Sequence, residues 1–218
     1  MKKSTIVIVS GALVLIAFAL GAYVYNQQQA ARLGEMARGS DTVLNRPHAP
    51  AYGSPDAKVV LVEFFDPACE TCRDFYPLVK KIVNDSGGKV RLVLRYAPFH
   101  KGSDEAIRIL EAARIQNLYW PALEATLKAQ PTWAAHHQPQ PQLIWQEIGD
   151  IGLNLRRARD DVGSARITGI IDQDLLDASA LNVTKTPGFF VNGKPLKDFG
   201  ADQLMDLVRT EVRAVYGQ

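Results

Sequence analysis

The sequence predicts an α/β fold in which a mixed β-sheet is covered by helices and interrupted by a helical insertion. Three observations support this fold class. An apolar, β-branched run over 58–65 is followed by helical periodicity and then by a second strand at 90–96. A long stretch without strand-like alternation separates this unit from a hairpin and a closing amphipathic helix. An apolar segment at the start of the chain predicts a transmembrane or signal helix before the folded part.

Length and charge limit the possible classes of function. The chain has 218 residues, and the part that follows the first fifty or so suits one domain with a single core. Lys and Arg number 25 against 23 for Asp and Glu, which gives a formal net charge of +2. Such a balance produces no field that attracts nucleic acid, so we expect no nucleic-acid partner.

The N-terminal segment over residues 5–25 determines the expected compartment. It is apolar apart from Thr5, Ser10 and two glycines, and as a helix it spans about 30 Å, the thickness of a bilayer core. Lys2 and Lys3 precede it, which places the N-terminus in the cytoplasm and the rest outside. We therefore expect an anchor in the inner (cytoplasmic) membrane. The periplasmic or extracytoplasmic side is an oxidising space in which cysteines pair.

Two other readings of this segment remain open. Ala17-Phe18-Ala19 resembles a signal-peptidase site, so residues 1–26 are either a signal anchor or a cleaved signal peptide. The segment is also compatible with a buried helix of a soluble protein. Residues 27–52 are rich in Gln, Ala, Arg and Pro and predict a linker made of a short helix and an extended tether. The domain is expected over 53–218.

The first structural unit of the domain is a strand, a helix and a second strand. Lys58 to Phe65 is the near-continuous apolar run of a strand buried on both faces, and Asp66-Pro67-Ala68 ends it. From Cys69 onward apolar residues recur at helical spacing until Gly87-Gly88, and Val90 to Tyr96 forms the next strand.

The stretch over about 103–177 predicts the helical insertion. One helix is expected from the apolar spacing between Ala106 and Ile115, and others over Pro121 to Lys128, Gln142 to Asn154 and Gln173 to Ala180. Three tryptophans in this block, Trp120, Trp133 and Trp145, are expected to pack in the core.

The C-terminal part predicts a hairpin and a helix. Gly188 to Val191 is a short apolar strand that Asn192-Gly193 turns into Lys194 to Leu196, because this dipeptide favours tight hairpin turns. Leu204, Leu207, Val208, Val212 and Val215 then recur at the spacing of an amphipathic helix.

Cys69 and Cys72 are the candidate reactive residues. They lie where the first strand gives way to a helix, so Cys69 is expected to cap or precede the helix N-terminus. The unpaired N–H groups and the dipole at that end stabilise a thiolate, which is the attacking species in disulfide exchange. Cys72, one turn further in, suits the resolving role. A purely structural disulfide is disfavoured, because so small a ring removes little entropy from the unfolded chain.

Metal binding is the main alternative use of this cysteine pair. Zinc needs more ligands, and no second Cys/His pair at ligand spacing accompanies the cysteines. The adjacent His136 and His137 predict a solvated loop. Copper(I) accepts two thiolates with a weak third ligand, for which His100 is a candidate. No resident metal and no cofactor are expected in the leading reading.

Four spaced features resemble the thioredoxin-like, DsbA-type periplasmic thiol-disulfide oxidoreductases, over Lys58 to Tyr216. The first is FFDPACETC, a C-x-x-C at the end of a buried strand. The second is Pro77, five residues after Cys72, where the family has a helix-kinking proline. The third is Thr186-Pro187 before GFFVNG, and the fourth is the helical block between. The resemblance implies a thioredoxin-like fold and a redox enzyme.

The resemblance also implies roles for three residues outside the motif. Glu63 matches the family's buried carboxylate and would move a proton to or from Cys72, which requires a raised pKa; the alternative is a solvent-facing or edge glutamate. Pro187 matches the family's cis-proline, and Thr186 would offer backbone hydrogen bonds to an extended substrate segment; the alternative is an ordinary trans turn.

The sequence departs from the DsbA type between the two cysteines. Glu70 and Thr71 stand where those oxidants have a Pro-His pair. A carboxylate close to Cys69 raises the pKa of the thiol and weakens the disulfide as an oxidant, and Asp66 adds to this effect if it lies near. We therefore expect a reduction potential between those of thioredoxin and DsbA, about −270 to about −120 mV.

Together these observations predict an extracytoplasmic oxidoreductase that exchanges disulfides with the thiols or disulfides of secreted proteins. Oxidase, reductase and isomerase directions remain open. A membrane redox partner and a monomeric state are expected, since too few residues precede the first strand for a dimerisation domain. Phe64, Phe65, Phe99 and Phe189 are either core residues or an apolar surface for clients. Two alternatives are a copper-binding or copper-delivery protein and an anchored interaction module with vestigial cysteines.

Overall fold

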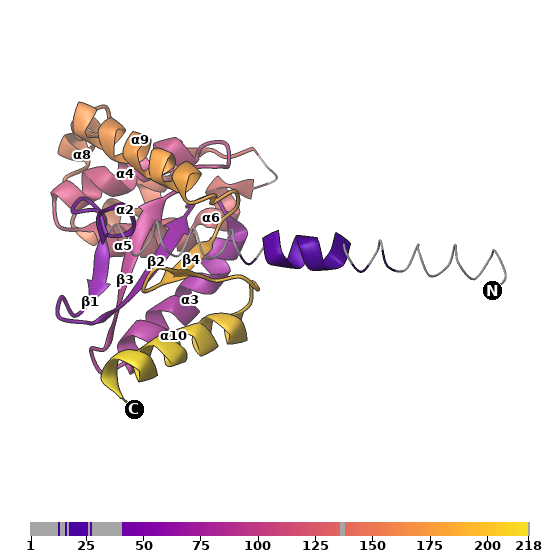
Figure 1. Cartoon of the computed structure of the whole chain (residues 1–218). Coiled ribbons are helices and arrows are strands. Elements are labelled where there is room, and N and C mark those ends of the chain that lie inside the picture. The colour runs from indigo at the N-terminus through magenta and orange to yellow at the C-terminus, as the bar shows by residue number, and fades with distance from the viewer. Residues whose placement is uncertain are drawn as a thin grey trace, which may run out of the picture.

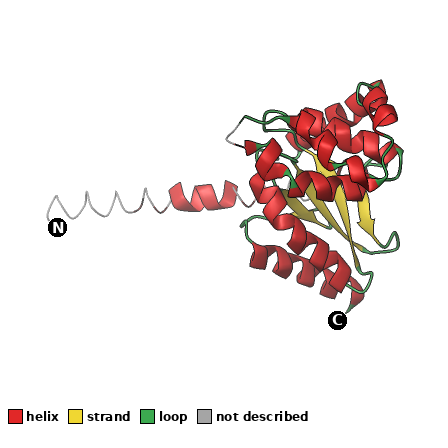
Figure 2. Cartoon of the chain, turned by 180° about the vertical axis from the view of Figure 1, so that it is seen from behind, coloured by secondary structure: helices red, strands yellow, loops and turns green. Residues whose placement is uncertain are grey.

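The computed structural model describes residues 13, 16, 18–25, 27, 41–135 and 138–217. Strands of these residues form one five-stranded sheet in the order β1-β3-β2-β4-β5, with helices on both sides (Figures 1 and 2). The predicted α/β fold with a mixed sheet is confirmed. The elements are α2 (Asp41–Leu44), β1 (Ala51–Gly53), β2 (Val59–Phe65), α3 (Glu70–Asp85), β3 (Val90–Tyr96), α4 (Ser103–Ile115), α5 (Tyr119–Lys128), α6 (Gln130–Trp133), η2 (Pro141–Leu143), α7 (Ile144–Glu147), η3 (Gly149–Ile151), α8 (Leu155–Asp161), α9 (Ala165–Ala180), β4 (Gly188–Val191), β5 (Lys194–Pro195) and α10 (Ala201–Tyr216).

The sheet combines parallel and antiparallel pairs around the central strand β2. β2 runs parallel to β3 and antiparallel to β4, while β1 and β5 pair antiparallel at the two edges. The helix α3 makes the crossover between the two parallel strands, as a parallel pair requires. The hairpin between β4 and β5 turns at Asn192 and Gly193, both with positive φ, as the sequence predicted.

The two faces of the sheet bury alternate residues of the strands. One face packs against α3 and α10 and includes Leu61, Phe65 and Leu94. The opposite face packs against α2 and α9, where Val62 and Phe64 lie in a second cluster of buried apolar residues. Because successive strand side chains alternate between faces, Glu63 points towards the α3 side. The sheet therefore presents this residue beneath the helix that carries the cysteines.

The helical insertion agrees with the prediction at α4 and α5 and differs further along. The single helix expected over Gln142 to Asn154 is broken into η2, α7 and η3, and Gly152 has a φ of 84° that a helix does not accommodate. The helix expected at Gln173 begins earlier, at Ala165. Trp133 is fully buried, and Trp120 and Trp145 pack against the core, as expected.

The end of the predicted linker belongs to the folded domain. Residues 51–53 form β1, which pairs with β3, and Leu44 of α2 is buried. The sequence did not indicate this edge strand, because three residues with a terminal glycine carry too short a pattern. The expected boundary at residue 53 is thus too late, since the packed chain begins by residue 43.

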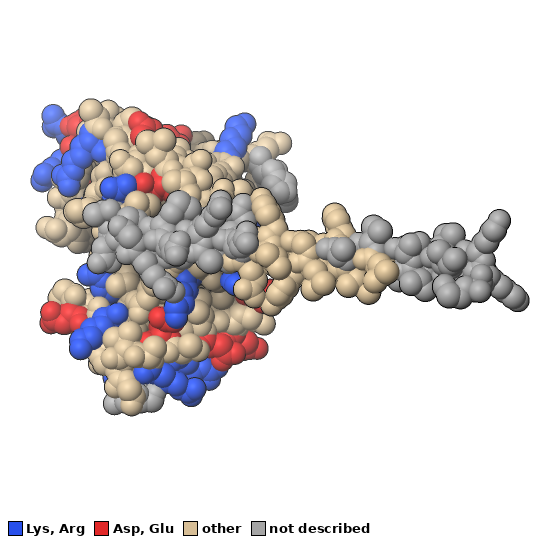
Figure 3. All heavy atoms as spheres, in the orientation of Figure 1, with Lys and Arg blue, Asp and Glu red and all other residues tan. Residues whose placement is uncertain are grey.

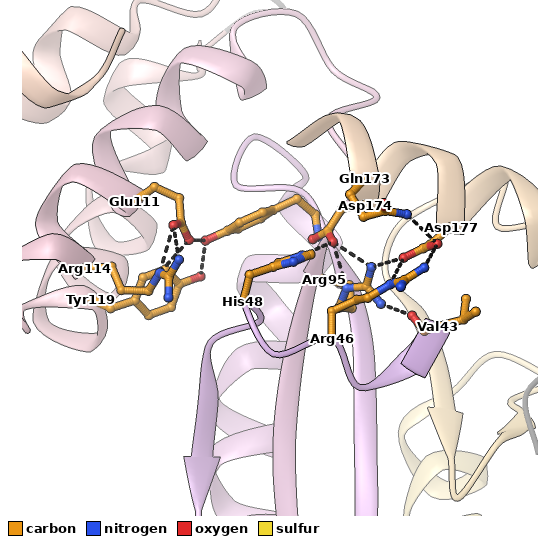
Figure 4. A network of polar contacts seen from close by, with 11 residues as sticks. Val43, Arg46, His48, Arg95, Glu111, Arg114, Tyr119, Gln173, Asp174 and Asp177 are labelled. Atoms are coloured by element: carbon orange, nitrogen blue, oxygen red, sulfur yellow. Dashed lines mark hydrogen bonds and ion pairs between the residues drawn. The ribbon is translucent and has the colours of Figure 1, made fainter. Parts of the chain in front are cut away.

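A buried polar network fastens this segment to α9 (Figure 4). Arg95 of β3 is fully buried and donates to Asp174 at 2.6 Å and to Asp177 at 2.6 Å. Arg46 donates to both oxygens of Asp177, and His48 contacts Asp174 at 2.7 Å. Two guanidinium groups face two carboxylates, so the buried charges are compensated. The network holds α2, β3 and α9 in a fixed arrangement on one side of the sheet.

The predicted apolar segment over residues 5–25 lies in large part outside the described residues. Residues 18–25 are helical. Among the residues that the structure describes, no helix has the length and apolar character needed to cross a membrane. His136 and His137 also lie outside the described residues. On the face seen in Figure 3, basic and acidic side chains are interspersed over the domain.

Candidate active site

Cys69 and Cys72 lie at the start of α3, as the sequence predicted. Cys69 is the N-cap residue, with extended φ and ψ of −75° and 119°, and no side chain caps the helix. The N–H groups of the first helical turn are therefore available to the sulfur of Cys69. Both cysteines are free thiols, and Cys72 is fully buried while Cys69 is 5% exposed. The sulfur nearer solvent is the one at the helix end.

The surroundings of Cys69 favour its anionic form. A hydrogen bond from the Cys72 thiol has the largest effect, and the side chain of Thr186 and the backbone N–H groups of Cys72 and Thr71 act in the same direction. Burial opposes them, but the net result lowers the pKa of Cys69 to about 5. Glu70 is exposed and is not among the largest causes of this shift.

Two neighbouring groups are held in their neutral forms. Burial raises the pKa of Cys72 well above its ordinary value, and the hydrogen bond to Cys69 and the charge of Glu63 add to this effect. Glu63 is 1% exposed, and neither carboxylate oxygen has a hydrogen-bond partner in the described part of the chain. Burial, followed by the charge of Cys69, raises the pKa of Glu63 to about 8. The alternative of a solvent-facing or edge glutamate is wrong, since β2 is the central strand.

The loop before β4 lies against the sulfur of Cys69. The Thr186–Pro187 peptide bond is cis, which confirms the sequence prediction. The Cys69 thiol donates to the carbonyl oxygen of Thr186 at 3.4 Å. The two segments are 117 residues apart in the chain and meet because β4 pairs with β2, whose end leads into α3. A backbone carbonyl group thus lies beside the sulfur of Cys69.

Asp66 organises the loop in front of the cysteines, a role that the sequence did not reveal. Its carboxylate is fully buried, and its backbone oxygen accepts from Cys69 N at 3.1 Å. Asp66 is not among the largest causes of the shift in the Cys69 pKa. The donors to the carboxylate are the backbone N–H groups of Ala68, Phe99 and His100, the Nδ1 of His100 and the hydroxyl of Ser103.

Gln130 of α6 is a second residue that sequence reasoning missed. Its side-chain amide donates to the carbonyl oxygens of Pro67 at 2.8 Å and Cys69 at 2.9 Å. Gln130 is 1% exposed, and its own oxygen has no partner among the described residues. The helical insertion therefore reaches back to the loop that carries Cys69.

Aromatic side chains gather beside α3 and the hairpin. Phe75, Phe189 and Phe199 form a cluster with ring centroids 4.8 to 6.4 Å apart. Of the four phenylalanines considered in the sequence, Phe64, Phe65 and Phe189 are buried, and Phe99 is 43% exposed. Phe199, which the sequence did not single out, is 44% exposed. Phe99 and Phe199 thus supply exposed apolar surface. Phe64, Phe65 and Phe189 are core residues.

His100, the candidate copper ligand, is engaged with Asp66. Its Nδ1 lies 2.7 Å from Asp66 Oδ2, and although burial opposes protonation, this contact and the Asp66 charge raise the pKa of the imidazole. The described residues hold no group of three or more His, Cys, Asp or Glu side chains arranged to bind a metal ion. No observation at this site favours the copper alternative.

Comparison with known proteins identifies the family. Residues 45–209 match the thioredoxin family. This chain belongs to the thioredoxin family. The match spans the sheet, the cysteine helix, the insertion and most of α10, so the insertion lies within the family domain.

Individual relatives of this thioredoxin-family chain differ in overall length. A thioredoxin-like oxidoreductase from Silicibacter pomeroyi DSS-3 is 30% identical with a TM-score of 0.69, over 79% of this chain and 96% of that one. Disulfide bond formation protein D of Bacillus subtilis (strain 168) is 25% identical over 81% of this chain and 84% of its own length. The Na(+)/H(+) antiporter NhaA of Herminiimonas arsenicoxydans is 30% identical over 86% of this chain, but the chain spans only 30% of the antiporter's length.

Proposed function

We propose that this thioredoxin-family chain is an extracytoplasmic thiol-disulfide oxidoreductase that exchanges disulfides with protein clients through Cys69 and Cys72. The observation that carries the proposal is the pair of opposite pKa shifts at the two sulfurs, with Cys69 low and Cys72 high. One sulfur is reactive at neutral pH and the other is held in reserve, as sequential attack and resolution require.

The chemistry is a transfer of one disulfide in two substitutions at sulfur. In the oxidising direction, a client thiolate attacks Cys69 of the Cys69–Cys72 disulfide, and Cys72 leaves with the electron pair and takes up a proton. A second client thiolate then attacks the client sulfur of the mixed disulfide and releases Cys69 as a thiolate. The client loses two electrons and the cysteine pair gains them. The reverse sequence reduces a client disulfide with the same residues.

Glu63 is the proton donor and acceptor for Cys72 in this scheme. With a pKa of about 8, it is largely protonated at neutral pH and has a proton to give when Cys72 leaves as a thiolate. Its two oxygens have no other partner among the described residues, so no competing hydrogen bond holds them. The negative charge of Cys69 raises the pKa of Glu63, and a negative charge on Glu63 raises the pKa of Cys72. The protonation of Glu63 is therefore coupled to the ionisation of the two sulfurs.

Thr186 and Pro187 form the client-binding edge. The Thr186 carbonyl that meets the Cys69 thiol is free to accept from the backbone of an extended client segment once Cys69 is a thiolate or disulfide. Pairing at this edge would place the client sulfur next to Cys69. Exposed Phe99 and Phe199 add apolar surface for unfolded segments.

The cellular setting follows from the start of the sequence. The apolar residues 5–25 would act as an inner-membrane anchor or as a signal peptide, and either places the domain on the periplasmic or extracytoplasmic side. We propose that a membrane redox partner recycles the cysteine pair and that the domain works as a monomer. The relative in Bacillus subtilis, named for disulfide bond formation, supports the proposed disulfide exchange.

Insulin reduction and oxidation of a reduced client peptide test the proposal directly. The wild-type chain should turn over in both assays, Cys69→Ser should abolish turnover, and Cys72→Ser should accumulate a mixed disulfide that mass spectrometry detects. Serine retains the size of cysteine and removes the nucleophilic thiolate. Wild-type protein that is folded and inert in both assays would refute the proposed function.

A further inference from the structure

We propose that Gln130, from the helical insertion, is a positioning residue that holds Cys69 in the place where its thiolate is stabilised. This inference deepens the proposed function and rests on it. Gln130 makes no contact with either sulfur. Its effect passes through the backbone carbonyls on both sides of Ala68.

The geometry of the amide leaves Gln130 one orientation. Both hydrogens of Nε2 are used, one for the carbonyl of Pro67 and one for that of Cys69. A flipped amide would set its oxygen against two carbonyl oxygens, which repel it. The Oε1 atom is buried and has no hydrogen-bond partner among the described residues. Buried polar atoms without a partner are rare in native proteins. The side chain is therefore committed to holding the loop.

The position of Cys69 decides the ionisation of its thiol. The Cys72 thiol and the N–H groups of Thr71 and Cys72 lower the pKa only while the sulfur lies at the helix end. Hydrogen bonds weaken steeply with distance and misalignment. Cys69 and Pro67 precede the regular part of α3, so the intrahelical ladder alone does not fix them; Arg73 N to Cys69 O is the first such bond. Asp66 holds the N–H groups of Ala68 and Cys69, and Gln130 restrains the carbonyl groups of Pro67 and Cys69 from outside the helix.

Gln130 also links two parts of the domain that the cysteine motif does not connect. Its helix, α6, lies 61 residues beyond Cys69, and Trp133 in the same short helix is fully buried with its indole donating to Thr126 O at 2.9 Å. A buried anchor thus sets the position of α6, and Gln130 transmits that position to the active-site loop. The insertion therefore influences the redox properties of the cysteine pair without touching the sulfurs.

The test replaces Gln130 with methionine, which has similar volume and no donor. In the reduced full chain, the rate of Cys69 alkylation measured against pH should give a Cys69 pKa about one unit higher than in wild type. The glutathione equilibrium should shift about tenfold towards the disulfide, which is about 30 mV more reducing. Gln130→Glu should shift both further in the same direction, since a carboxylate faces two carbonyl oxygens and adds negative charge.

Two variants separate positioning from general stability. Trp133→Phe removes a buried donor from the same helix but no contact to the loop. Phenylalanine still fills the buried site and Gln130 is intact, so this variant should lower the melting temperature and raise the Cys69 pKa much less than Gln130→Met does. Gln142→Met makes the same chemical change at an exposed glutamine of the insertion, whose side-chain amide donates to Gln140 at 3.5 Å and holds no part of the cysteine loop. It should alter neither quantity.

The outcomes distinguish this inference from the proposed function. If wild-type protein exchanges disulfides but Gln130→Met retains both its Cys69 pKa and its glutathione equilibrium, the positioning role is wrong and the function stands. An equal pKa rise in Trp133→Phe would also overturn it, because loosening of α6 alone would then suffice. If wild-type protein exchanges no disulfides while its Cys69 pKa still responds to Gln130, the function fails and the positioning remains.

Discussion

At the scale of single residues, the site separates one reactive sulfur from a proton reserve. Cys69 has its pKa lowered to about 5, whereas burial keeps Cys72 and Glu63 protonated. Burying a neutral group costs less free energy than burying a charged one. The buried Cys72 and Glu63 therefore stay protonated, and the negative charge lies on Cys69 at the helix end. This division follows from the location of the residues at the end of β2 and the start of α3.

Glu63→Gln should slow resolution of the mixed disulfide by about 10- to 100-fold, because the variant removes the proton donor and acceptor for Cys72. Attack by Cys69 should remain within about twofold of wild type, since the helix end that lowers its pKa is unchanged. Rapid-mixing kinetics with a model peptide disulfide separates the two steps. Equal slowing of both steps, or unchanged release, would contradict the proton-transfer role.

The same variant should change how stability depends on pH. The pKa of Glu63 is raised from 4.5 to about 8 on folding, so the unfolded chain releases this proton first and wild-type stability falls as pH rises through that window. At pH 7 the loss is about 3 kcal/mol. Glu63→Gln should therefore gain stability relative to wild type between pH 5 and 8, measured by urea denaturation of both proteins under reducing conditions, which keep the Cys69 charge that contributes to the shift. If the difference in unfolding free energy between Glu63→Gln and wild type does not vary with pH, the carboxyl group of Glu63 has an ordinary pKa.

Site residues were predictable from the sequence where spacing along the chain defines them. Cys69, Cys72 and Glu63 lie within ten residues on one strand and helix, and Pro187 precedes a recognisable hairpin. Gln130 carries no such signal, because its partners are more than 60 residues away and a glutamine before a proline is common in loops. Asp66 was noticed only as a charge near Cys69, since its donors come from the loop after β3.

At the scale of elements, the packing of α9 on β3 depends on compensated charge. Arg95 lies between Asp174 and Asp177 with no exposed side-chain surface. Removing one partner of a buried ion pair leaves an uncompensated charge, which costs far more than the pair itself contributes. The network therefore fixes the arrangement of α2, β3 and α9 rather than merely adding stability.

Arg95→Met should lower the free energy of unfolding by about 3–5 kcal/mol, because two carboxylates lose their buried cation. Arg209→Met, which breaks the exposed pair with Asp206, should cost at most about 0.5 kcal/mol. Denaturant titration of both variants gives the comparison. Similar losses in the two variants would show that the Arg95 network is not critical for packing.

Elements were predictable in proportion to the length of their pattern. The strands β2 and β3 and the helices α3, α4 and α10 have long apolar periodicity, and the structure confirms them. The edge strand β1 has three residues and is held by pairing to β3, a partner that local sequence does not reveal. The region from η2 to η3 is apolar at helical spacing, but its glycines and tertiary contacts divide it into short turns.

At the scale of the whole molecule, the thioredoxin-like framework sets the strength of the oxidant through the ionisation of Cys69. A pKa of about 5 lies between the values of about 7 for thioredoxin and about 3.5 for DsbA. A more stable thiolate favours the reduced pair and makes the disulfide more oxidising. The position of Cys69 at the end of α3 and its contacts across the fold thus determine redox behaviour.

The reduction potential should fall between about −270 and about −120 mV, measured by equilibrium with glutathione and mass spectrometry of alkylated cysteines. Glu70→Ala should change the value by less than about 30 mV, because Glu70 is exposed to screening solvent and is not among the largest causes of the Cys69 shift. A reduction potential at the DsbA end of this range would contradict the prediction, because the Cys69 thiolate would then be more stable than the N-terminus of α3 explains.

Direct titration of the Cys69 thiol tests the account most simply. The reduced full chain, with Cys72 buried and protonated, should show a single thiol ionisation near pH 5 in its ultraviolet absorbance and in the pH dependence of alkylation. That result would confirm that the helix end and its hydrogen bonds hold sulfur as an anion. An ordinary value of about 8.5 would contradict the account, since the sulfur would then have no activation for exchange at neutral pH.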